Sequence, residues 1–255
     1  MPTPSSCPLS PVPCPLIKAI LFDLGETLIN FGKVDTAALF KESARLSYEF
    51  LRQTGQPVCG FRRYYWRNIF AIRVMYVWSY ITGRDFNSLN LLRGIGIKRG
   101  YKLSEEQWQQ FAWCWYEPLV KIATAEPDIR QTLSRLRDAG LKLGIVSNTF
   151  LTQSSLDRHL EQFGILEFFL LRIYSHQTPW RKPSVKIFNE AARRLGLAPQ
   201  EIMFVGDRLD NDVKGALKAG MIPILKVAYT SCGKKIPPTI RKINLLSELP
   251  SLITP

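Results

Sequence analysis

The chain has 255 residues, of which 46% are hydrophobic and 22% charged, a balance that is ordinary for a folded protein and argues against general disorder. Its 34 Lys and Arg residues outnumber its 21 Asp and Glu residues, and the resulting net charge of +13 favours anionic ligands. Five scattered cysteines without a C-x-x-C pair argue against a disulfide framework and a structural zinc site, and favour a cytoplasmic location.

Proline recurs throughout the first sixteen residues, so we expect a disordered leader over residues 1–16. No basic start precedes an apolar run there, and a signal peptide is therefore not expected. The apolar run over residues 17–22 then predicts a buried strand. A polar turn follows it and contains Asp23, Gly25 and Thr27.

Residues 34–122 are predicted to form an inserted, all-helical cap that is basic and rich in tryptophan. Helices are expected over 35–53, 61–82 and 104–121. The last begins with a capping-box pattern, Ser104-x-x-Gln107. The apolar stretch over residues 64–81 contains central arginines, which cost roughly 2.5–3.5 kcal/mol each in membrane insertion. We therefore expect a buried helix and no membrane span, with the tryptophans mostly packed in a core.

Strands and helices alternate in the remainder of the chain. Strands are predicted over 141–146, 168–174, 202–205 and 222–226. Helices are predicted over 129–139, 154–163, 185–195 and 212–219. This alternation predicts an α/β fold, in which residues 17–33 and 123–255 form a Rossmann-like parallel sheet core and the helical cap is inserted.

Chemically useful side chains follow three of these strands or lie between them. They are Asp23 and Thr27, Ser147 and Asn148, Lys182, and Asp207. Because ligands bind beyond the carboxyl ends of parallel strands, we expect these side chains to converge. A carboxylate can attack phosphorus, two carboxylates can bind Mg²⁺, and a hydroxyl, an amide and an ammonium can hold phosphoryl oxygens. The pattern therefore predicts phosphoryl transfer.

In order and spacing, these segments resemble the motifs of the haloacid dehalogenase-like superfamily over residues 17 to 250. The segments are Phe22-Asp23-Leu24-Gly25-Glu26-Thr27-Leu28, Val146-Ser147-Asn148, Lys182-Pro183, and Val205-Gly206-Asp207 followed by Asn211-Asp212 and Gly215-Ala216. The helical insert is similar to the C1 cap of that family. The resemblance implies a hydrolase of the phosphatase-like branch that acts on small phosphorylated metabolites.

The resemblance also implies roles for individual residues. Asp23 is the expected nucleophile and Lys182 the second catalytic residue. Thr27, Ser147, Asn148 and Lys182 are the expected phosphate contacts. Mg²⁺ is the expected cofactor, with Asp23, the main-chain carbonyl of Gly25, and Asp207 as its ligands. Helix capping and metal support are equally open roles for Asp210 and Asp212.

Gly25 departs from the family pattern, because phosphatases of the family usually carry an Asp there as general acid and base. A glycine cannot protonate a leaving group, a contribution worth about 10²–10⁴-fold in rate. Three explanations stay open. The substrate has a good leaving group, such as an acyl phosphate or a sugar 1-phosphate; Glu26 or a cap residue supplies the proton; or catalysis is weak.

Two other functions compete with the phosphatase. A 2-haloacid dehalogenase would use the same Asp23 without a metal, and a catalytically weak binding protein would use the basic cap as its working surface. The basic cap also leaves nucleic acid open as a partner, although no motif supports it. His159 and His176 are expected to be structural or solvated. The sequence does not fix the oligomeric state.

Overall fold

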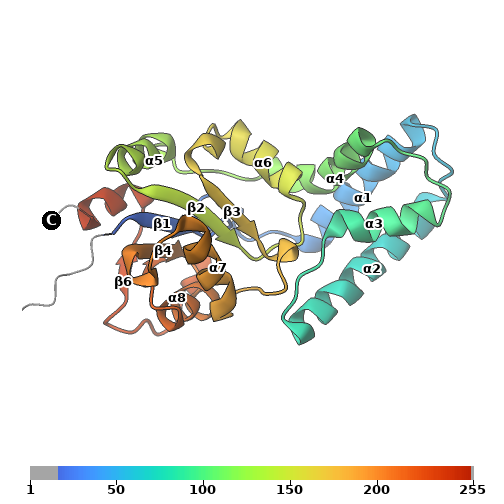
Figure 1. The fold of residues 1–255 in the computed structure, drawn as a ribbon. Helices are drawn as coiled ribbons and strands as arrows, with labels where there is room; N and C mark the ends of the chain where they lie inside the picture. The colour runs from blue at the N-terminus through green and yellow to red at the C-terminus, as the bar shows by residue number, and fades with distance from the viewer. Residues whose placement is uncertain (1–16, 254–255) are drawn as a thin grey trace, which may run out of the picture.

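The computed structural model describes residues 17–253, so the predicted leader lies outside the described residues. Its centre is one six-stranded sheet with the strand order β3-β2-β1-β4-β5-β6, in which every neighbouring pair is parallel (Figure 1). The strands are β1 (Ala19–Phe22), β2 (Lys142–Ser147), β3 (Leu171–Tyr174), β4 (Ile202–Gly206), β5 (Ile222–Lys226) and β6 (Arg241–Ile243). Because β1 lies between β2 and β4, the residues that follow these three strands meet at one edge.

Helices cover both faces of the sheet. One face carries α5 (Ile129–Asp138) and α6 (Gln153–Gln162), and the other carries α7 (Val185–Leu195) and the short α8 (Lys214–Lys218) (Figure 1). Successive side chains of β1 point to opposite faces, as in any strand. Ile20 and Phe22 accordingly join the hydrophobic cluster beneath α5 and α6, and Ala19 and Leu21 join the cluster beneath α7.

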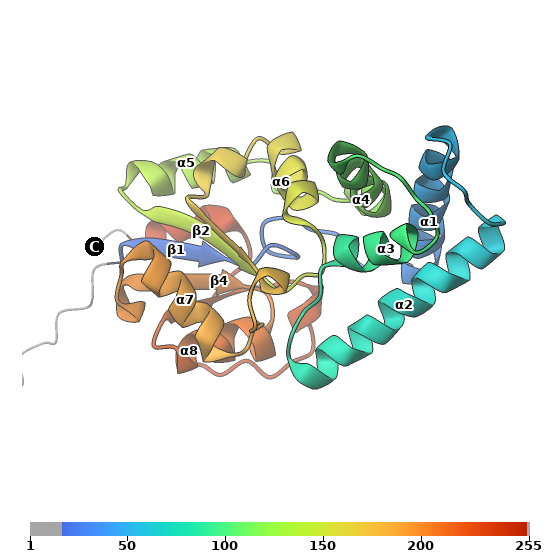
Figure 2. The same ribbon diagram turned by 45° about the vertical axis from the view of Figure 1, so that its right-hand side comes forward.

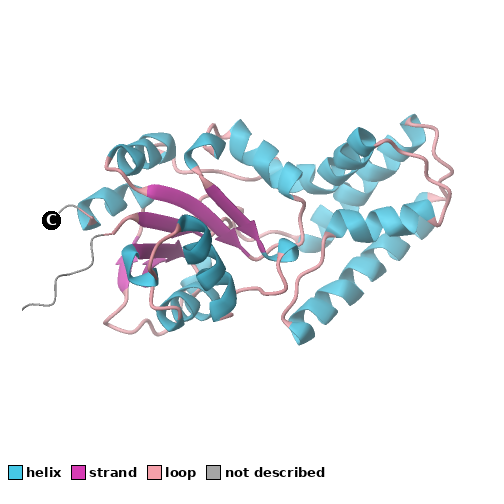
Figure 3. Ribbon diagram, viewed as in Figure 1, coloured by secondary structure: helices cyan, strands magenta, loops and turns pink. Residues whose placement is uncertain are grey.

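The chain between β1 and α5 forms a separate group of helices beside the sheet (Figures 1 and 3). They are α1 (Thr36–Gln53), α2 (Phe61–Thr82), α3 (Ser88–Ile97) and α4 (Glu105–Val120). They pack around their own hydrophobic cluster, which includes Tyr64 and Trp108. Helix α4 begins with the predicted capping box, because Gln107 N–H donates to Ser104 Oγ over 3.2 Å and Ser104 N–H donates to Gln107 Oε1 over 2.9 Å.

The apolar stretch over residues 64–81 forms the predicted helix, but it is buried only on its inner side, at residues such as Tyr64, Ile69 and Ile72. Helix α2 lies along the outer side of the helical group, as Figure 2 shows, and has apolar side chains on both its inner and its outer face. Phe70 is 70% exposed, Tyr80 82% and Ile81 76%. Trp66 and Trp78 are also exposed, whereas Trp108 and Trp113 are buried as expected. No helix among residues 17–253 is long and apolar enough to cross a membrane.

The predicted fold class is confirmed, with two elements missed and one shortened. Helix α3 was missed because Gly94 and Gly96 weaken its helical signal. A Cβ at Gly96 would lie 2.5 Å from the Tyr101 ring and 2.8 Å from the Trp108 ring, so tertiary packing selects the glycine. Strand β6 has only three residues. Residues 209–213 form a π-helical turn, which shortens the predicted 212–219 helix to α8.

Candidate active site

A cavity of about 840 Å³ opens between the carboxyl edge of the sheet and the helical group. Asp23 directly follows β1, Ser147 ends β2, and Asp207 directly follows β4, and all three line this cavity. Lys182, from the loop between β3 and α7, lines it too. The predicted convergence of strand ends is therefore present in the structure.

Three carboxylates form a buried cluster on the floor of the cavity. Asp23, Asp207 and Asp212 each offer an oxygen, and these oxygens lie within 4.8 Å of one another. Lys182 Nζ lies 2.8 Å from Asp23 Oδ1 and 2.6 Å from Asp212 Oδ1. Asp210, in contrast, lies at the surface and pairs with Lys214 over 3.0 Å. Of the two acids whose roles the sequence leaves open, only Asp212 lies in the cluster.

The cluster has more negative than positive charge, since three carboxylates face one ammonium. Burial, followed by the charges of Asp23 and Asp212, raises the pKa of Asp207 to about 7. Burial also raises the pKa of Asp212, against the pull of Lys182. For Lys182, burial alone would lower the pKa, but the charges of Asp212 and Asp23 outweigh it and raise that pKa. The surplus of negative charge is what a bound divalent cation would balance.

Individual oxygens of the cluster fit a cation such as Mg²⁺. Asp207 Oδ1 is buried and accepts no hydrogen bond from any described residue, whereas its Oδ2 accepts from the Thr230 hydroxyl. Asp212 uses Oδ1 for Lys182, and its Oδ2 accepts from the Arg208 N–H over 2.9 Å. An orphaned carboxylate oxygen beside a second buried carboxylate, Asp23, matches the hard oxygen donors that Mg²⁺ prefers.

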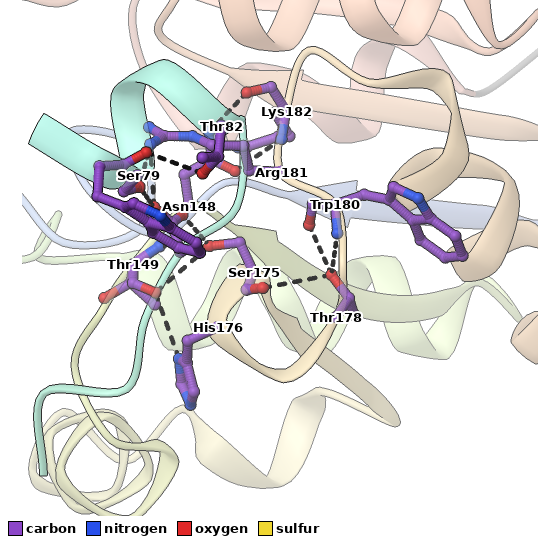
Figure 4. Close-up of polar contacts among 12 residues, drawn as sticks. Ser79, Thr82, Asn148, Thr149, Ser175, His176, Thr178, Trp180, Arg181 and Lys182 are labelled. Atoms are coloured by element: carbon purple, nitrogen blue, oxygen red, sulfur yellow. Dashed lines mark hydrogen bonds and ion pairs between the residues drawn. The ribbon is translucent and has the colours of Figure 1, made fainter. Parts of the chain in front are cut away.

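Asn148 holds the loop that carries Lys182 (Figure 4). Its Nδ2 donates to the Lys182 carbonyl, and its Oδ1 accepts from the Lys182 N–H, both over 2.8 Å. Both polar groups of the Asn148 side chain are therefore bonded to the main chain of Lys182. The main-chain N–H of Asn148 is left for the predicted phosphate contact. A main-chain pair of this kind fixes the end of β2 relative to the loop after β3.

The turn after Asp23 places its other candidate residues differently. Gly25 lines the cavity, whereas Thr27 is buried and is not among the lining residues. Glu26 has a φ of 56°, and its Oε1 accepts from the N–H groups of Phe31 and Gly32 over 2.8 and 3.0 Å. Its Oε1 thus stabilises the turn, whereas Glu26 also lines the cavity, so its role as the missing acid stays a prediction. The phosphate contact of Thr27 stays a prediction.

Asp85 is a residue that sequence reasoning missed, and it joins the helical group to the core. It lies between α2 and α3 and accepts hydrogen bonds from Ser79 and Ser175. It also forms an ion pair with Arg181, the neighbour of Lys182, over 2.9 Å. Figure 4 shows Arg181 beside Ser79, with Ser175 below them. A lone aspartate in a loop has no sequence pattern that could have identified this contact.

Comparisons with known proteins agree with this geometry. A family model for haloacid dehalogenase-like hydrolases matches residues 17–220. A glyceraldehyde 3-phosphate phosphatase of Methanopyrus kandleri is 32% identical over 209 residues, which cover 82% of this chain and 83% of the relative. The chain belongs to the haloacid dehalogenase-like hydrolase family. The predicted membership is therefore confirmed.

Other haloacid dehalogenase-like relatives have a similar sequence or fold. A glyceraldehyde 3-phosphate phosphatase of Pyrococcus abyssi is 30% identical and covers 81% of this chain and 79% of its own length. A phosphatase structure from Thermococcus onnurineus superposes with a TM-score of 0.57 at 25% identity, covering 93% of this chain and 98% of that one. A 2-haloacid dehalogenase from Pseudomonas syringae has a TM-score of 0.60 at 23% identity over the same shares, a likeness of fold alone.

Proposed function

We propose that this protein is a Mg²⁺-dependent phosphatase of small phosphorylated metabolites that works through an aspartyl-phosphate on Asp23. The observation that carries the proposal is the buried cluster of Asp23, Asp207 and Asp212 around Lys182 on the floor of the cavity. Matches to phosphatases over four fifths of the chain support the same activity. The three free cysteines among the described residues accord with a cytoplasmic location.

Each residue has a defined task in the proposed reaction. A carboxylate oxygen of Asp23 attacks phosphorus as the ester P–O bond breaks, and water then hydrolyses the aspartyl-phosphate. Lys182, held by Asp23 and Asp212, together with the Ser147 hydroxyl and the Asn148 N–H, stabilises the phosphoryl oxygens.

Asp23, Asp207 and the Gly25 carbonyl would hold Mg²⁺ at this site. When bound, the ion neutralises the repulsion between a phosphate dianion and the carboxylates. The orphaned Asp207 oxygen favours this activity over a dehalogenase, because carbon attack on a haloacid needs no cation there.

A substrate panel tests the proposal. Phosphate esters, including glyceraldehyde 3-phosphate, acyl phosphates and 2-haloacids are assayed with Mg²⁺ and with EDTA. We expect phosphate release that requires Mg²⁺ and is lost in Asp23→Asn. Halide release that persists in EDTA would contradict the proposed phosphatase activity and show that the protein is a dehalogenase. If the folded protein released neither phosphate nor halide from any substrate, the result would favour the hypothesis of a binding protein without catalytic activity.

A further inference from the structure

The wall of the cavity that the helical group α1–α4 forms, called the cap wall below, is largely apolar and aromatic. Helix α1 contributes Leu39 and Phe40, and α2 contributes Ile72, Tyr76 and Val77. Core loops add further apolar lining at Phe31, Phe150, Leu151 and Tyr229. Phe150 is fixed in place by stacking on Phe86, with ring centroids 5.2 Å apart. Thr36 and Arg73 are the polar residues of α1 and α2 that line the same wall. An aromatic ring would gain from burial against the remaining, apolar part of the wall.

The same cavity has no carboxyl group at position 25 and few other side-chain acids that could protonate a leaving group. Outside the carboxylate cluster, its only lining carboxyl groups among the described residues are Glu26 and Asp85. Glu26 accepts two main-chain hydrogen bonds at Oε1, and Asp85 is held by Ser79, Ser175 and Arg181. None of the described histidines lines the cavity. A leaving group that is stable as an anion would need no proton from any of these side chains.

We propose that the substrate is an aryl phosphate, a monoester whose leaving group is an aromatic ring carrying a phenolic oxygen. This inference rests on the proposed phosphatase function. A phenol has a pKa of about 10, the value of tyrosine, so its anion is a stable leaving group. An alcohol is about as weak an acid as water, whose pKa is about 15.7, and its anion leaves poorly without a proton donor. The aryl ester suits both the aromatic wall and the glycine at position 25.

The proposed step balances without a side-chain acid. The Asp23 carboxylate forms a new P–O bond, the bond from phosphorus to the phenolic oxygen breaks, and the aryloxide leaves with the electron pair. Solvent water protonates that aryloxide. A second water then attacks phosphorus, gives its proton to solvent, and releases inorganic phosphate and the Asp23 carboxylate.

Position 25 allows the missing acid to be restored. Gly25 does not have a positive φ, so its backbone accepts any side chain. A Cβ built there would meet only the Phe31 ring, at 3.6 Å, which is ordinary van der Waals contact. Gly25→Asp should therefore fold, and Gly25→Asn is a matched control of the same size without the carboxyl proton.

The test compares phenyl phosphate with benzyl phosphate in the presence of Mg²⁺, because both carry a ring but only the first has a phenolic oxygen. We expect kcat/KM of the unmodified protein to be at least about 100-fold higher for phenyl phosphate, the scale of a missing general acid. Gly25→Asp should raise kcat/KM for benzyl phosphate at least about tenfold, and Gly25→Asn should not. Equal rates on the two esters, or equal effects of Asp and Asn, would overturn the inference.

Two further measurements keep the inference falsifiable if Gly25→Asp does not fold. A series of ring-substituted phenyl phosphates should show log kcat/KM falling steeply as the pKa of the phenol rises, and a flat series would overturn the inference. Phe40→Ser should raise KM for phenyl phosphate but leave inhibition by inorganic phosphate unchanged. No phosphate release from any ester, including 4-nitrophenyl phosphate, would instead contradict the proposed phosphatase function itself.

Discussion

The two walls of the cavity are built by different physical means. On the core wall, buried charged groups such as Lys182 and Asp212 neutralise one another, and strand ends and main-chain hydrogen bonds position them. On the cap wall, most lining side chains of α1 and α2 are apolar, and several, such as Phe40 and Val77, are partly or largely exposed. Substitutions on the core wall should therefore abolish activity or folding, whereas substitutions on the cap wall should alter substrate preference.

The largest expected effect is at the nucleophile. Asp23→Asn should lower kcat by at least about 10⁴-fold, because removing a nucleophile removes a whole covalent step. The protein should still fold, since Lys182 keeps its contact with Asp212. Steady-state assays with Mg²⁺ measure the loss, and thermal unfolding checks the fold. Asp210→Asn, a surface change in the same family motif, should retain activity; equal losses in both variants would refute the assignment.

Lys182→Met should affect both stability and rate. It leaves Asp23 and Asp212 buried without their shared cation, and breaking a buried ion pair costs about 3–5 kcal/mol. We expect a loss of this size in the free energy of unfolding, measured with urea in EDTA, and a fall in kcat of about 10²–10³-fold. Lys186→Met changes a lysine on α7 outside the cavity and should change neither quantity. A Lys182→Met protein as stable as the original would show that the pair is not buried in solution.

Metal-free protein should lose stability as pH rises from about 4 to about 7. The folded pKa of Asp207 is raised to about 7, whereas the unfolded value is about 3.9, so the folded state alone holds the proton in this window. Stability is complete below the unfolded pKa and falls until the folded pKa is passed. Urea unfolding at pH 5 and pH 8 in EDTA measures the fall. It should shrink in Asp207→Asn and on addition of Mg²⁺ to the original protein; a fall unaffected by both would contradict the prediction.

Asp85 tests the junction between the two walls. Asp85→Asn weakens the contact with Arg181, and the resulting displacement beside Lys182 should lower kcat/KM between about 10-fold and 100-fold. The free energy of unfolding should change much less than in Lys182→Met. If kcat/KM were unchanged while stability fell, the junction would be structural only.

The smallest expected effect is at Arg73, an exposed residue of α2 that lines the cavity. Arg73→Ala should raise KM about twofold to fivefold without changing kcat, since an exposed charge contributes less than about 1 kcal/mol. Higher salt should reduce the difference between the two proteins. Arg62→Ala, at the far end of the same helix, is the matched control. A loss of kcat in Arg73→Ala would move this residue into the catalytic group.

The sequence predicted the core wall much better than the cap wall. Asp23, Ser147 and Asp207 follow strands, and parallel strands bring their ends together wherever the helices between them lie. The exposure of α2 could not be predicted, because apolar residues on every side of a helix normally indicate burial. The contact made by Asp85 depends on how the cap docks, and the role of Glu26 depends on one turn with positive φ. Neither leaves a periodic pattern in the chain.

The hydrogen bonds from Asn148 have one further consequence. They join Asn148 to the main-chain N–H and C=O of residue 182, a pair of groups that every amino acid except proline possesses. They do not involve the ammonium at the end of the Lys182 side chain. Main-chain hydrogen bonds therefore position residue 182 in the site, whatever side chain it carries. A designed enzyme could therefore carry a different side chain at position 182 on the same main chain, provided that Asp23 and Asp212 were changed to match it.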